Sequence, residues 1–291
     1  MSTSRPSSAQ HPQPWLSCAL LLVCAIALTY SRQLEREVRA ASAAAAERAA
    51  DYWSERPYLE PAEIVVRHLG SDTIESRRAE HRRERSQTRA LAVPKAVKSH
   101  YQEILDGLTA EALEPLSKLP QYRLGVRGAE GDGRAYLVHA FLHGGWPQLA
   151  GNGVLLIVLG FAIERIWGHA LFAAVALASS LAAAVAFRLG NPELDAAWIG
   201  ASGMLAGLLG AFAVRFAARW SEPGYGGLIA AGACWLLAPG ALGWNASLVA
   251  GPTASGPIEG AAQASLWGIA GGFACGLAFG ALIVFGRIES T

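Results

Sequence analysis

The chain has 291 residues, of which 52% are hydrophobic and 16% are charged, and its mean hydropathy is +0.28. These values are too apolar for an ordinary soluble protein and indicate a membrane protein. The formal net charge of +1 gives no surplus of positive potential for a polyanion, so we expect no nucleic acid partner. The four cysteines lie in apolar runs without CxxC spacing, a pattern that indicates neither a disulfide framework nor a zinc knot.

Charge is concentrated in one part of the chain. Residues 31–134 carry 18 of the 24 basic and 17 of the 23 acidic residues. The stretch from residue 135 to 291 has only 5 basic and 6 acidic residues. The sequence therefore predicts an all-α protein, a polytopic bundle of membrane helices with a charged helical insertion.

The N-terminal part predicts a tail followed by a first membrane helix. Residues 1–14 are rich in Ser, Pro and Gln, as in a disordered cytoplasmic tail. The uncharged run that follows approaches the ~17–25 residues that a membrane helix needs, and we place the first transmembrane helix at residues 15–31. A cleaved signal peptide is the alternative, because Ala25-Ile26-Ala27 is an A-x-A triplet. The triplet lies inside the apolar run rather than after it, which favours a retained helix.

Residues 32–134 have the composition of a helical soluble domain. Ser99 and Gln102 have the spacing of a capping box and predict the start of a helix at Ser99. An arginine series between residues 77 and 89 resembles a nucleic acid or lipid headgroup patch. Glutamates are interleaved with it at helical spacing, so we expect a solvated face that pairs with itself.

Five further apolar runs follow, at about 147–167, 170–187, 201–220, 225–242 and 261–286. With the first helix they predict six transmembrane helices. A cytoplasmic N-terminus places five arginines of the tail and short loops inside and only Arg188 outside. We therefore expect an integral protein of the bacterial inner membrane with both termini cytoplasmic and the 32–134 domain outside. The five inner arginines are Arg5, Arg165, Arg215, Arg219 and Arg287.

The densest polar group of the apolar half combines two histidines and two amides, and a GASG tetrapeptide follows later. Polar residues in membrane helices are costly and therefore informative. Here the sequence, over residues 135–287, resembles the rhomboid family of intramembrane serine proteases. The stretch from His139 to Asn152 is similar to the first part of the family's second helix. That helix ends in an acidic-basic pair, which here is found in Glu164-Arg165-Ile166-Trp167-Gly168. The residues that carry the resemblance are His139, His143, Gln148, Asn152, Gly200, Ala201, Ser202 and Gly203.

The resemblance implies a rhomboid-like membrane core with Ser202 as the nucleophile and with His139 and His143 in structural roles. Free backbone N–H groups and the positive dipole end at a helix start favour an oxyanion beside Ser202. Gln148 and Asn152 are amides four residues apart on one helical face, suited to donate hydrogen bonds to the same oxygen. The family usually has a histidine where Gln148 stands.

The last helix departs from the family pattern of a histidine, a glycine three residues later and another four further. Gly272 and Gly276 fit the two glycines, but the base position falls on Ile269, and no histidine follows His169. A serine hydroxyl needs an adjacent base to become a nucleophile. Loss of the base costs subtilisin about 10⁶-fold in turnover, or roughly 8 kcal/mol of barrier. The position four after Ser202, often aromatic in the family, is Ala206.

A glycine ladder at four-residue spacing in the 261–286 run and complementary glycines in the 201–220 run predict that these two helices pack closely. The two series are Gly203, Gly207 and Gly210, and Gly268, Gly272, Gly276 and Gly280.

Three functions remain open from the sequence. The first is a pseudoprotease that binds transmembrane segments of client proteins in the lipid bilayer without cutting them. The second is an active intramembrane serine endopeptidase in which Ser202 works with a non-standard base. A transporter or channel ranks last, because the apolar half shows no charge placed mid-helix and no inverted repeat. We expect no cofactor and no metal, since Ala140 stands between His139 and His143 where a zinc protease has glutamate.

Overall fold

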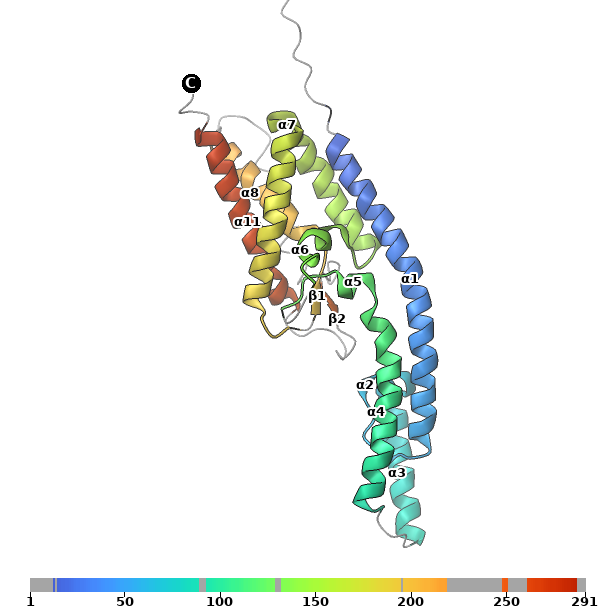
Figure 1. Cartoon of the computed structure of the whole chain (residues 1–291). Coiled ribbons are helices and arrows are strands. Elements are labelled where there is room, and N and C mark those ends of the chain that lie inside the picture. Colours follow the sequence, from blue (N-terminus) through green and yellow to red (C-terminus); the bar gives the residue numbers. More distant parts are fainter. Residues whose placement is uncertain are drawn as a thin grey trace, which may run out of the picture. The chain divides into compact units, whose positions relative to one another are not determined.

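The computed structural model describes residue 13 and residues 15–88, 93–128, 132–194, 196–218, 248–250 and 261–286. Its contacts divide the chain into two units. Unit 1 comprises residues 1–29, 124–249 and 259–291, and unit 2 comprises residues 30–123 and 250–258. Figure 1 traces the elements along the chain. The apolar helices belong to unit 1, and the charged segment forms most of unit 2.

The described part of unit 2 consists mainly of helices. It contains the later part of α1 (Trp15–Ser54), followed by α2 (Glu63–Leu69), α3 (Ser71–Thr88), α4 (Lys95–Ser117) and α5 (Pro120–Arg123). Helix α1 does not stop where its apolar run ends, because the alanine-rich sequence that follows has high helix propensity. A core of fully buried side chains holds the unit together: Ala49, Trp53, Leu59, Val65 and Leu105.

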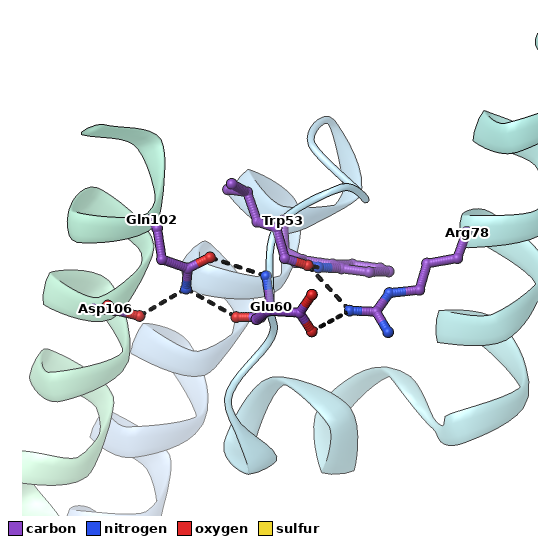
Figure 2. A network of polar contacts seen from close by, with 6 residues as sticks. Trp53, Glu60, Arg78, Gln102 and Asp106 are labelled. Atoms are coloured by element: carbon purple, nitrogen blue, oxygen red, sulfur yellow. Dashed lines mark hydrogen bonds and ion pairs between the residues drawn. The ribbon is translucent and has the colours of Figure 1, made fainter. Parts of the chain in front are cut away.

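The loop between α1 and α2 is held by side chains from three helices (Figure 2). The indole of Trp53 donates to the carbonyl of Leu59 at 3.1 Å. Arg78 on α3 binds the same carbonyl at 3.2 Å and the Glu60 carboxylate at 2.8 Å. Gln102 on α4 accepts from the Glu60 N–H at 2.9 Å and donates to its carbonyl at 3.0 Å. These bonds satisfy backbone groups that no secondary structure pairs.

Two details of the sequence analysis change here. The capping box is wrong, because α4 begins at Lys95 behind Pro94 and Ser99 lies inside the helix. Pro94 is the N-cap residue and has an extended backbone, with ψ 143°. Gln102 does not cap the helix and instead holds the α1–α2 loop. Arg77 and Glu80 form the predicted helical pair at 3.9 Å, whereas Arg78 pairs with Glu60 from another segment.

Besides the start of α1, unit 1 contains a short segment that we call the pre-helix segment (residues 135–145). It contains α6 (Ala135–Val138) and the 3-10 turn η1 (His139–Phe141). The elements that follow are α7 (Trp146–Gly190), β1 (Ala196–Trp198), α8 (Ser202–Ala218), β2 (Leu248–Ala250) and α11 (Ala261–Gly286). The strands β1 and β2 pair with each other in a two-stranded sheet.

Helix α7 is broken at Gly168, which has φ 82° and ψ 170°. This left-handed region is open to glycine and costly for other residues. The break separates a first α7 segment (residues 146–167) from a second α7 segment (residues 169–190). The two predicted runs at 147–167 and 170–187 are thereby confirmed as two helices.

Three of the described helices are long and apolar enough to cross a membrane, namely α1, α7 and residues Gln263–Gly286 of α11. Helix α8 is apolar but shorter, with 17 residues. The runs predicted at 201–220 and 261–286 correspond to α8 and α11. The predicted run at 225–242 lies outside the described residues.

The predicted glycine contact between α8 and α11 is confirmed. A Cβ atom added to Gly207 would lie 2.9 Å from the Gly272 carbonyl oxygen. One added to Gly210 would lie 2.6 Å from the carbonyl oxygen of Phe273. The backbones therefore touch where a side chain on either helix would force them apart, as small residues allow in membrane bundles.

The N-terminus of α1 is fixed by a carboxylate that the sequence analysis named only as part of the exit of the second helix. Glu164, fully buried at the end of the first α7 segment, accepts hydrogen bonds from the backbone N–H groups of Leu16 and Ser17 at 3.2 and 2.7 Å. It also accepts from the Ser17 hydroxyl and, at 2.7 Å, from Nδ1 of His169. Glu164 thus satisfies N–H groups that the first turn of a helix leaves unpaired.

Candidate functional site

Ser202 is the first residue of α8 and is fully buried. The turn before it depends on Gly200, whose φ of +111° suits glycine rather than L side chains. The Gly200 N–H donates to the carbonyl of His139 at 2.9 Å. This bond ties the start of α8 to the pre-helix segment, so the predicted nucleophile and the predicted histidine region lie together.

The two predicted amide donors lie against this turn. A Cβ atom on Gly200 would lie 2.5 Å from Nε2 of Gln148 and 3.7 Å from Nδ2 of Asn152. Both amides come from the first two turns of α7 and are buried. The side chains of Gln148 and Asn152 therefore contact the turn that precedes Ser202. Only glycine fits at position 200, because any side chain there would collide with Gln148.

The hydrogen bonds of these amides fix their orientation. Gln148 donates from Nε2 to the carbonyl of Ile199 at 3.3 Å and accepts from the Gly144 N–H at 2.7 Å. Asn152 donates from Nδ2 to Nε2 of His143 at 3.3 Å. Nε2 of Gln148 and Nδ2 of Asn152 are therefore bonded to protein acceptors next to the turn before Ser202. Amide N–H groups are donors of the type that can stabilise an oxyanion when they face it.

The two histidines bond to groups other than Ser202. Nδ1 of His139 donates to the Ala135 carbonyl at 3.0 Å, and Nδ1 of His143 donates to the Phe141 carbonyl at 3.3 Å. Burial lowers the pKa of each imidazole to about 4, so both rings are neutral near pH 7. His143 can therefore accept from Asn152 through its remaining ring nitrogen.

The hydroxyl of Ser202 has no hydrogen-bond partner among the described residues. A base would have to accept a hydrogen bond from this oxygen. Ile269, at the position where the resemblance puts the base, is 6% exposed and belongs to the same apolar cluster as Ala201 and Met204. Ala206, in the same cluster, is fully buried. Neither Ile269 nor Ala206 carries a group that could accept this proton.

Trp198 is a site residue that the sequence analysis missed. Its ring stacks on His139 at 5.3 Å and on Phe187 at 5.2 Å between centroids. A Cβ atom on Gly203 would lie 2.9 Å from this ring, and one on Gly268 would lie 2.5 Å from it. Trp198 thus occupies the space that glycine leaves on both α8 and α11, and it holds His139 in place. No sequence motif marks Trp198, because its ring joins β1 to four other segments of the chain.

The remaining predicted residues take packing roles. Gly272 and Gly276 contact the backbones of Gly203 and Gly207. His139 and His143 lie with Ala140 in the pre-helix segment, and the described residues contain no group of three His, Cys, Asp or Glu side chains suited to a metal ion.

Comparison with known proteins gives one match. A family model described as the Rhomboid domain matches residues 131–285. No curated protein and no solved structure matches the chain significantly. The matched span is more than half of the chain and contains the pre-helix segment, α7, α8 and α11. These helices form an all-α membrane bundle in a lipid environment, and the chain belongs to the rhomboid family.

Proposed function

We propose that this rhomboid-family protein is a pseudoprotease that binds transmembrane segments of client proteins without cutting them. The observation that carries the proposal is the unpartnered hydroxyl of Ser202, which agrees with an isoleucine, Ile269, at the position where the resemblance puts the base. The donor side of the site persists in Gln148 and Asn152, while the residues that the structure describes offer the Ser202 hydroxyl no proton acceptor. A site of this kind can hold a polar group of a client, but it cannot activate the serine.

The expected loss of turnover is large. An isoleucine cannot take the proton of the Ser202 hydroxyl, and by comparison with subtilisin the missing base costs about 10⁶-fold, or roughly 8 kcal/mol. The donors that remain contribute to transition-state binding but do not replace a base. Binding of transmembrane segments, by contrast, needs only the bundle and its surface in the bilayer.

An active endopeptidase is the second candidate, and one contact favours it. Asn152 bonds directly to Nε2 of His143, so an imidazole lies one side chain away from the donor group beside Ser202. In this alternative a rearranged His143 is the base. Nε2 would have to leave Asn152 and accept from Ser202 instead.

The test is labelling of the full-length protein in liposomes with a fluorophosphonate, together with cleavage assays on synthetic transmembrane substrates. We expect no labelling and no cleavage that depends on Ser202. Turnover that disappears in Ser202→Ala establishes the active endopeptidase, and a parallel loss in His143→Ala identifies the base. The matched control is Ser179→Ala, which removes another buried hydroxyl without a partner in the described structure.

We further propose a bacterial inner-membrane location with cytoplasmic termini and residues 32–134 outside. Glu164 brings the start of α1 next to the break between the α7 segments, so the N-terminus and Arg165 share one side of the membrane. Arg188, near the other end of the second α7 segment, bonds to Tyr136 of the pre-helix segment at 3.2 Å. These two contacts support the membrane topology that the arginine distribution predicts. The contact of Glu164 with the start of α1 also supports a first helix that is retained.

A further inference from the structure

An apolar cavity of about 120 Å³ lies beside α8 in unit 1. Its walls come from α1, the pre-helix segment, the second α7 segment and α8. Met204, two residues after Ser202, lines it, as do Phe141 and Leu20. An occupant of this cavity therefore contacts both the segment that carries the histidines and the helix that carries Ser202.

The cavity opens toward the outside of the helix bundle. Leu137 and Leu177 line it and are 52% and 54% exposed. Ala173, which also lines it, is exposed as well. In a bilayer these residues face the hydrocarbon, so a group carried by another transmembrane helix can reach the cavity without crossing water.

One polar group lines the cavity. Ser180 is 5% exposed, and its hydroxyl has no hydrogen-bond partner among the described residues. A buried hydroxyl without a partner is costly, whereas pairing it recovers the hydrogen bond. Water is a poor occupant, because a buried water needs two to four polar partners and this cavity offers a single hydroxyl.

We propose that this cavity receives one tyrosine side chain from the transmembrane segment of a client protein. The inference rests on the proposed client binding and names its contact point. An enclosed apolar cavity of about 150 Å³ holds benzene. This cavity is smaller, at about 120 Å³, but it is open at Leu137 and Leu177, so it encloses an aromatic ring in part rather than completely. The phenol hydroxyl pairs with Ser180 while the ring packs on Phe141 and Met204. A lipid acyl chain fits the apolar walls but leaves Ser180 unpaired.

The chemistry of the cavity is tested with p-cresol, the side-chain analogue of tyrosine, and with toluene, which lacks the hydroxyl. Binding to the full-length protein in micelles is followed by saturation-transfer NMR. We expect p-cresol to bind about fivefold more tightly than toluene, as one neutral hydrogen bond allows, and the difference to vanish in Ser180→Ala. Equal affinities in the wild type overturn the assignment of tyrosine.

The docking step is tested in liposomes with a lysine-flanked leucine/alanine transmembrane peptide that has a central tyrosine next to a photoreactive group. Ala173→Phe fills the cavity mouth, and Ala174→Phe, an exposed neighbour outside the lining, is the matched control. We expect cross-linking to fall at least fivefold in Ala173→Phe and to stay unchanged in Ala174→Phe. Circular dichroism of both variants checks that the helices remain folded.

The other outcomes separate this inference from the proposed function. Cross-linking to the wild type that Ala173→Phe does not reduce overturns the cavity as the docking site and leaves client binding standing. Absence of cross-linking to the wild type overturns both. A phospholipid that copurifies with the wild type and is lost only in Ala173→Phe, without an effect on the peptide, shows a lipid site and overturns the inference.

Discussion

At the scale of single residues, two constraints require glycine at position 200. Its φ of +111° excludes an ordinary side chain, and a Cβ atom would collide with the amide of Gln148 at 2.5 Å. The same residue also donates its N–H to the carbonyl of His139. One glycine therefore lets the amides of α7, the pre-helix segment and the first turn of α8 meet.

We expect Gly200→Ala to destabilise the protein by about 1–3 kcal/mol, the cost of a strained backbone residue, with displacement of Gln148. The measurement is the thermal midpoint in detergent micelles. The control is Gly107→Ala in α4, where nothing lies within 4 Å of an added Cβ and the exchange should stabilise the helix by up to about 1 kcal/mol. Equal effects of the two exchanges contradict the prediction.

Ile269 is the second position where we expect one residue to decide the chemistry. We expect Ile269→His to restore some fluorophosphonate labelling of Ser202, because α11 packs on α8 through glycines that bring the two backbones into contact. Adding Gln148→His and Ala206→Tyr should raise labelling by more than the sum of the single effects, since catalytic groups act as a unit.

The readout is labelling per folded molecule, with Ser202→Ala in the same background as the control. A folded triple variant that labels no better than this control shows that Ile269 does not occupy the base position.

At the scale of elements, Glu164 holds the first turn of α1 against α7. It is a buried carboxylate that accepts from two backbone N–H groups, a hydroxyl and an imidazole. A helix start favours negative charge, because its free N–H groups and dipole are positive. The contact makes residues 15–29 an integral part of the membrane bundle.

We expect Glu164→Gln to lower the free energy of unfolding by about 1.5–3 kcal/mol, the usual worth of a hydrogen bond to a charged group. The measurement is a denaturation curve in mixed micelles. Glu193→Gln is the control, since Glu193 is exposed in the loop after α7. If both variants unfold at the same denaturant concentration as the wild type, Glu164 does not anchor α1.

The elements and their closest contacts differ in how far the sequence could predict them. Glycine spacing predicted the α8–α11 contact, because small residues at every fourth position mark a helix face that can approach another backbone. The motifs also predicted that the amides of α7 would meet the start of α8. The roles of Glu164 and Trp198 could not be predicted, since each joins segments that are distant in the sequence and no local pattern records them. The start of α4 was missed because Pro94 outweighs a capping pair.

At the scale of the whole molecule, the distribution of charge divides the chain into an apolar part and a charged part. The apolar helices carry the site, and the charged segment forms a helical unit with its own core. The arginine distribution predicts that this unit lies outside the cytoplasm.

We expect an alkaline phosphatase fusion at about residue 95 to be active, because the enzyme folds only outside the cytoplasm. A fusion at the same point to a reporter that works only in the cytoplasm should be inactive. The reverse result would place residues 32–134 inside and would move Ser202 to the cytoplasmic half of the membrane.

The burial of α8 bears on how the protein is made. Every residue from Ser202 to Phe212 is buried, so this stretch of α8 meets protein rather than lipid. Its glycine face has its partner on α11, which is synthesised later. During synthesis, the contact between these glycine faces can therefore form only after α11 has been made. Insertion of the last helix is the event that closes this part of the bundle.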